Sequence, residues 1–136
     1  MQCYSFLFSC LWCCLQLVEK LKKQGELQLN EKRAKVVAEL QKLKQRADEF
    51  SDFSELAMVP QYLMDVRIVH KRLGDAQEQI IWINKEEALY KFSITQFPEV
   101  DEIAAAIDPY MKLFQIVNKW QKVEKKYVLD FTYYMF

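Results

Sequence analysis

Glycine and proline are scarce in this sequence, which holds two glycines and three prolines in 136 residues. Sheet proteins use glycine in their turns, and phosphate-binding loops use it where the backbone approaches a ligand closely. Gly25 and Gly74 are too few for a P-loop or for a G-x-G-x-x-G dinucleotide motif. The composition therefore predicts an all-α fold and argues against the common nucleotide-binding loops.

Histidine occurs once, and neither sign of charge is in excess. His70 lies in the segment VHKR, beside two cations, which indicates a solvated helix position. A Ser-His-Asp or Cys-His nucleophile system would depend on this residue alone. Lysine plus arginine equals aspartate plus glutamate at 19 each, so there is no electrostatic case for nucleic-acid binding. We predict no catalytic, cofactor-binding or metal-binding residue, no cofactor and no small-molecule substrate.

Cysteine is confined to the uncharged, apolar segment 1–18, where Cys3, Cys10, Cys13 and Cys14 lie. The one C-x2-C step stands among Leu, Phe and Trp, unlike the polar, glycine-containing turns of zinc knuckles. A disulfide framework would spread its cysteines through the fold. Four interpretations of the segment stay open: a buried helix, a start foreign to the ancestral domain, a membrane anchor, or a signal peptide without its usual basic start.

The charged region 19–91 predicts two long helices that are broken near Pro60. Seam residues at spacings of four and three form a heptad pattern, interrupted by Arg33, in the first helix: Leu29, Val36, Leu40, Leu43, Ala47 and Phe50. The second helix carries a similar seam: Val66, Val69, Leu73, Ala76, Ile80, Ile83 and Tyr90. If the second helix is continuous, it is about 45 Å long, which predicts an elongated molecule. Folding back at Pro60 would give an αα-hairpin, and running on would give a rod.

Residues 92–98 alternate apolar and polar side chains before Pro98, which predicts a short extended connector. After it, four acids are expected to begin helices rather than to form an active site: Glu99, Asp101, Glu102 and Asp108. We expect Asp108 to cap a separate helix that begins at Pro109 and closes at the charged run KVEKK. The apolar face of that helix should contain Tyr110, Leu113, Val117 and Trp120.

Aromatic residues at helical spacing predict core packing rather than stacking on bases, since interleaved Arg and Lys are lacking. They are Trp82, Phe92, Phe97, Tyr110, Phe114 and Trp120.

Four motifs in fixed order resemble the heavy chain of axonemal dynein, at the junction of its tail and its linker. They are ADEF at 47–50, NKEEALY at 84–90, ITQFPEV at 94–100 and PYMKLF at 109–114. The resemblance covers roughly residues 25–126 and predicts a tail-like part at 19–91 and the start of the linker at 92–126. Segments 1–18 and 127–136 depart from the family pattern. This predicts a truncated isoform, a partial gene copy or a gene model with wrong bounds.

The resemblance implies a mechanical and interaction element of a ciliary microtubule motor, without the ATP-hydrolysing ring of the parent family, and so not an enzyme. Its implied partners are dynein intermediate or light chains, or other heavy-chain segments, and its implied location is the cytoplasm, cytoskeleton and axoneme. Nucleic acid is not expected as a partner. The competing prediction is a helical interaction module that segment 1–18 tethers to a membrane.

Overall fold

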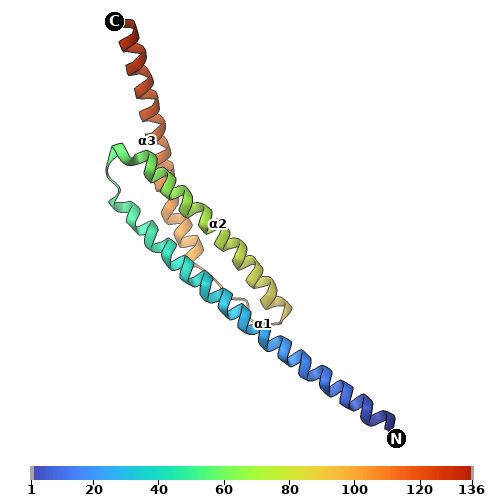
Figure 1. Cartoon of the computed structure of the whole chain (residues 1–136). Coiled ribbons are helices and arrows are strands. Elements are labelled where there is room, and N and C mark those ends of the chain that lie inside the picture. The colour runs from blue at the N-terminus through green and yellow to red at the C-terminus, as the bar shows by residue number, and fades with distance from the viewer. Residues whose placement is uncertain (1, 136) are drawn as a thin grey trace.

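The computed structural model describes residues 2–135, and in that range it contains helices and no strand. Three α-helices account for most of the chain: α1 (Gln2–Glu49), α2 (Val59–Leu89) and α3 (Glu99–Met135). Two short 3-10 helices, η1 (Phe50–Asp52) and η2 (Leu56–Met58), lie between α1 and α2. The termini lie at opposite ends of a long, narrow molecule (Figure 1). The expected elongated all-α fold is confirmed.

Helices α1 and α2 form an antiparallel hairpin, so the break near Pro60 gives a hairpin and not a rod (Figure 1). Pro60 lies in the first turn of α2, where its missing N–H has no intrahelical acceptor to lose. At 1.5 Å per residue, the 31 residues of α2 span about 46 Å. Residues 92–97 contain no regular element and connect α2 to α3, as the alternating pattern predicted.

The seams of α1 and α2 form one continuous hydrophobic core. All six seam residues expected in α1 are buried, and so are five of the seven expected in α2. Helix α3 adds four buried residues to this core: Val100, Ile103, Ile107 and Phe114. Each fully buried side chain of this kind contributes roughly 1.5–3 kcal/mol. The core therefore depends on all three helices.

Aromatic rings close the end of the core beside the hairpin turn. Phe53 stacks on Tyr62 with ring centroids 4.3 Å apart, and Tyr62 lies 5.7 Å from Phe114 of α3. Phe50 lies 6.1 Å from Tyr110 on the same helix. These contacts fix the turn and α3 to each other.

Helix α3 runs through Pro109 without a break, so the expected helix start at Asp108 is wrong. Buried Ile107 and Phe114 flank the proline on one face, and an unbroken helix keeps both side chains in the core. Asp108 accepts a hydrogen bond from Lys112 one turn later, at 2.6 Å, instead of capping a helix. Tertiary packing thus outweighs the hydrogen bond that proline removes. The helix also continues past KVEKK to Met135, so the expected end there is wrong.

Both outer arms of the molecule are exposed. Residues 3–18 of α1 and residues 122–135 of α3 extend beyond the part of the hairpin that could cover them (Figure 1). The interpretation of segment 1–18 as a buried helix is therefore wrong for the residues described. By length and composition alone, α1 contains a stretch apolar enough to cross a membrane, with mean hydropathy 1.2 in an 18-residue window.

Candidate functional site: the Glu87 clasp

The four acids that the sequence draws attention to are all exposed on the surface of α3. Glu102 accepts a hydrogen bond from Lys44 of α1 at 3.0 Å, and Asp108 pairs with Lys112. The hydrogen bond that Lys44 donates to Glu102 raises the pKa of the Lys44 ammonium. His70 is exposed, and the four cysteine thiols are exposed and free. Within residues 2–135, no three His, Cys, Asp or Glu side chains come together in a way that could hold a metal ion.

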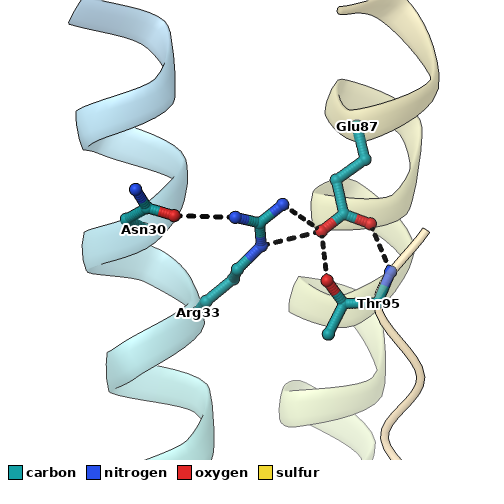
Figure 2. Close-up of polar contacts among 4 residues, drawn as sticks. All are labelled: Asn30, Arg33, Glu87 and Thr95. Carbon is teal, nitrogen blue, oxygen red and sulfur yellow. Dashed lines mark hydrogen bonds and ion pairs between the residues drawn. The ribbon is translucent and has the colours of Figure 1, made fainter. Parts of the chain in front are cut away.

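A different carboxylate, Glu87 of α2, is fully buried in the hairpin core. Arg33 of α1 donates to Glu87 Oε1 from Nε at 2.7 Å and also from Nη2. Thr95 of the connector donates its backbone N–H to Oε2 at 2.7 Å and its hydroxyl to Oε1 at 2.6 Å. Asn30 holds the other side of the guanidinium by accepting from Nη1 at 2.7 Å. Figure 2 shows these four residues, which we call the Glu87 clasp.

The clasp keeps Glu87 ionised although no part of the side chain reaches water. Burial alone would raise the pKa of this carboxyl. The two hydrogen bonds from Thr95 and the charged hydrogen bonds from Arg33 act in the opposite sense, and together they hold the pKa below its usual value. Because an unpaired buried charge is strongly unfavourable, the three elements must stay together for Glu87 to stay in the core.

The end of α2 directs the connector toward the clasp. The N–H of Lys91 bonds to the carbonyl of Ala88, and the N–H of Phe92 bonds to the carbonyl of Glu87. These two bonds form a Schellman motif, with Lys91 in the left-handed conformation at φ 58°. The chain therefore reverses immediately after α2, and Thr95 returns to the carboxylate of the last turns of the same helix.

A second set of contacts joins the end of α2 and the connector to α1, on the side of the clasp that faces the α1 arm. An added Cβ at Gly25 would stand 2.6 Å from the Tyr90 hydroxyl oxygen, so glycine leaves room for this ring against α1. Tyr90 stacks on Phe92 with centroids 5.8 Å apart, and the Lys22 ammonium lies 5.8 Å from the Phe92 ring. Gly25 is thus required by a close approach and not by its backbone angles.

The sequence contained signals for the clasp that periodicity reasoning missed. Arg33 interrupts the seam of α1 between Leu29 and Val36, and Glu87 fills the gap in the seam of α2 between Ile83 and Tyr90. A cation and an anion at seam positions of two antiparallel helices predict a buried pair. Glu87 and Thr95 also belong to two of the motifs that carried the family resemblance, at 84–90 and 94–100.

Two of the aromatic residues expected in the core lie mostly outside it. Trp82 is 38% exposed and has the Lys32 ammonium 3.2 Å from its ring centroid, so a cation–π contact holds it at the side of the hairpin. Trp120 is 57% exposed because α3 there approaches the end of the hairpin. Of the apolar face expected in α3, Tyr110 and Val117 pack against the core, whereas Leu113 is largely exposed and Phe114 is buried instead.

Comparisons with known proteins give one consistent group of relatives. No protein-family model matches the chain. "Dynein axonemal heavy chain 12" of Rattus norvegicus is 41% identical over 113 residues, which is 83% of this chain and 4% of the relative. The Homo sapiens protein of the same name gives the same values. "Dynein axonemal heavy chain 1" of Rattus norvegicus is 25% identical over 81 residues, or 60% of this chain and 2% of the relative.

The fold and the clasp define an elongated helical element whose one buried ionic site, among the residues described, joins two helices and a connector. The similarity adds the family. The chain is related to the heavy chains of axonemal dynein, as its motifs predicted, and it spans about 4% of the length of the heavy chain 12 relatives.

Proposed function

We propose that this chain is a mechanical and interaction element of an axonemal dynein heavy chain, working without a nucleotide site of its own. The observation that carries the proposal is the 41% identity to heavy chain 12 over 83% of the chain. On this proposal the chain acts at the axoneme of a cilium. Its partners are intermediate or light chains, or other segments of the heavy chain.

The position of the clasp supports assigning residues 19–91 to the end of the tail and residues 92–126 to the start of the linker. Thr95 lies in the connector between these parts, and Glu87 and Arg33 belong to the two helices before it. The clasp thus fixes the proposed boundary to the hairpin. Without the Glu87 clasp, the connector would be held by its Phe side chains and by the two backbone hydrogen bonds of the Schellman motif alone.

The direction of α3 explains how such an element could bear load. Contacts between α1 and α3 advance in the same direction along both helices, from Lys44 with Glu102 to Phe50 with Tyr110. The α1 arm and the α3 arm therefore leave the core at opposite ends (Figure 1). Tension between them shears the seams lengthwise, so many contacts resist at once, and the clasp lies beside the exit of the α1 arm.

Co-purification from ciliated cells tests the family role. The full chain with a small tag should stay with axonemes after detergent removes the membrane, and salt should release it together with dynein heavy or intermediate chains. Trp120→Glu, on the exposed face of α3, should weaken this association, whereas Lys119→Glu one position away should not. Recovery of the wild-type chain without any dynein chain, or ATP hydrolysis by the purified chain, would contradict the proposal.

Single-molecule stretching tests the mechanical role. We expect the full chain, held by tags at its two ends, to unfold cooperatively under tension, and we expect Glu87→Gln to lower the unfolding force. Lys112→Ala removes an exposed ion pair on α3 and serves as the matched control, with no change expected. Equal unfolding forces for the wild type and Glu87→Gln would show that the clasp bears no load.

A further inference from the structure

The arm formed by residues 3–18 of α1 has no charged side chain and no protein cover. All of its residues are exposed, and its large apolar side chains are mostly more than half exposed, with Phe6, Phe8 and Trp12 among them. An apolar patch of this size on a soluble protein marks an interaction site. The occupant can be inferred from how the apolar and charged residues are arranged.

The arm differs from the other exposed arm of the molecule in a way that favours lipid over protein. Residues 122–135 of α3 place exposed Val123, Val128 and Leu129 beside the charged residues Lys122, Glu124 and Asp130, a pattern suited to a protein groove. Residues 3–18 have no charge on any face. After the single acid Glu19, the basic residues Lys20, Lys22 and Lys23 follow, and Lys22 also contacts the Phe92 ring. Apolar length followed by cations matches hydrocarbon beside anionic headgroups.

The side chains of the arm are not distributed evenly around the helix. Its weakly polar residues share one side, because Ser9 and Gln16 are seven positions apart. Cys3, Cys10 and Cys14, at spacings of seven and four, share a different face of the helix. A helix that lies in the bilayer interface can turn such a thiol face toward the hydrocarbon.

We propose that this arm is an S-acylation site, and that fatty acyl groups on its cysteines hold the chain at a lipid bilayer. Cysteines on interfacial amphipathic helices are acceptors for such groups, and a short interfacial helix needs a second signal for stable anchoring. Cys13 lies next to Cys14 and adds a fourth exposed thiol. The proposal is independent of the dynein role, which rests on sequence similarity.

The reaction is a thioester exchange with a long-chain acyl-coenzyme A. The cysteine sulfur attacks the acyl carbonyl carbon and forms a new carbon–sulfur bond. The bond from that carbon to the coenzyme A sulfur breaks, and the cysteine proton passes to coenzyme A as its free thiol. No oxidant or reductant is required.

Metabolic labelling tests the modification. Cells expressing the tagged full chain are fed an alkynyl palmitate analogue, and the label is read on the purified chain before and after neutral hydroxylamine, which cleaves thioesters. We expect a hydroxylamine-sensitive label on the wild type and none on the variant with all four cysteines changed to serine. An unlabelled wild type, or a label that survives the four serine substitutions, would overturn the proposal.

Membrane fractionation with matched variants tests the anchoring. Changing all four cysteines to leucine keeps the arm apolar but removes every acceptor, and we expect it to lower the membrane-bound fraction roughly tenfold, as loss of one of two anchoring signals should. Circular dichroism should be unchanged, because the arm contacts no core residue. Membrane binding by the leucine variant equal to that of the wild type would refute acyl anchoring. Recovery of the wild-type chain in the soluble fraction, with its arm crosslinked to a protein, would refute it as well.

Purified, unacylated chain gives a further measurement. A larger fraction of the chain should float with vesicles of phosphatidylcholine and phosphatidylserine than with vesicles of phosphatidylcholine alone. Changing Lys20, Lys22 and Lys23 to glutamine should remove this difference. No flotation on either vesicle would show that the arm does not bind lipid.

Discussion

Removal of the Arg33 guanidinium should destabilise the fold more than any exposed charge substitution. In Arg33→Met the fully buried Glu87 keeps only the two hydrogen bonds from Thr95. Breaking a buried ion pair by removing one partner costs about 3–5 kcal/mol. The Arg33 side chain is 25% exposed, so water can enter part of the vacated space, and we expect a loss near 3 kcal/mol. Domains of this size are stable by roughly 5–15 kcal/mol, so the variant should unfold at clearly lower denaturant.

A double-mutant cycle separates the pair from its surroundings. Glu87→Gln leaves Arg33 partly hydrated but turns an amide N–H₂ toward donors of Thr95 or Arg33, which should cost about 1–3 kcal/mol. Combining Arg33→Met with Glu87→Gln removes both charges and keeps an amide oxygen as an acceptor for Thr95, so the buried charge that makes each single change costly is gone. The two single losses should therefore exceed the loss in the double variant. Losses under about 1 kcal/mol that add in the double variant would refute the reasoning. Denaturant unfolding followed by circular dichroism gives all four free energies.

The pH dependence of the same variants checks the charge state. The folded-state pKa of Glu87 lies below its usual value near 4.5. Its ionised form therefore contributes stability that is complete above the unfolded-state pKa and is lost as the pH falls through the folded-state pKa. The free-energy difference between wild type and Glu87→Gln should be constant at neutral pH and should shrink at acidic pH, below about 4.5. A difference that grows on acidification would mean that Glu87 is protonated in the fold.

Three backbone predictions test the elements around the clasp. Lys91→Gly should stabilise the protein by about 1 kcal/mol in denaturant unfolding, because glycine adopts φ 58° without strain; a destabilised variant would mean that the lysine side chain matters more than its backbone angle. Gly25→Ala should stabilise by about 1 kcal/mol only when Tyr90→Ala is also present, since the Tyr90 hydroxyl occupies the space of a Cβ at Gly25; equal effects in both backgrounds would contradict the close approach. Pro109→Ala should raise stability by about 2 kcal/mol by restoring a helical hydrogen bond; no gain would indicate that the helix already relaxes around the proline.

The hairpin core could be predicted because its information is local and periodic. All six residues of the α1 seam are buried, and the extended connector lies where the alternation of side chains placed it. Spacing alone reveals which face of a helix is apolar, and Pro60 reveals where a long helix must begin again. Neither inference needs knowledge of what packs on the other side.

The features that could not be predicted depend on that knowledge. Pro109 ordinarily begins or breaks a helix, and it lies inside α3 because Ile107 and Phe114 both reach the groove of the hairpin. Tyr110 and Val117 of the expected apolar stripe pack against the core, but α3 is rotated so that Phe114 is buried and Leu113 is exposed. Glu87 and Arg33 each look like a defect in a seam when one helix is considered, and only the pairing of the helices makes them partners.

The clasp also gives a physical reason why two of the motifs behind the family resemblance occur in this order. The segment 84–90 supplies Glu87 and the end of α2, and the segment 94–100 supplies Thr95 and the beginning of α3. The left-handed turn at Lys91 brings the second segment back to the first, so their spacing is set by the length of that return. An insertion in the connector would move Thr95 away from the Glu87 carboxylate. Because Glu87 is buried, water could not replace the lost hydrogen bonds. The connector is therefore part of the folded core in energetic terms, although its backbone has no regular structure, and force reaching α3 must first act on the helices that hold it.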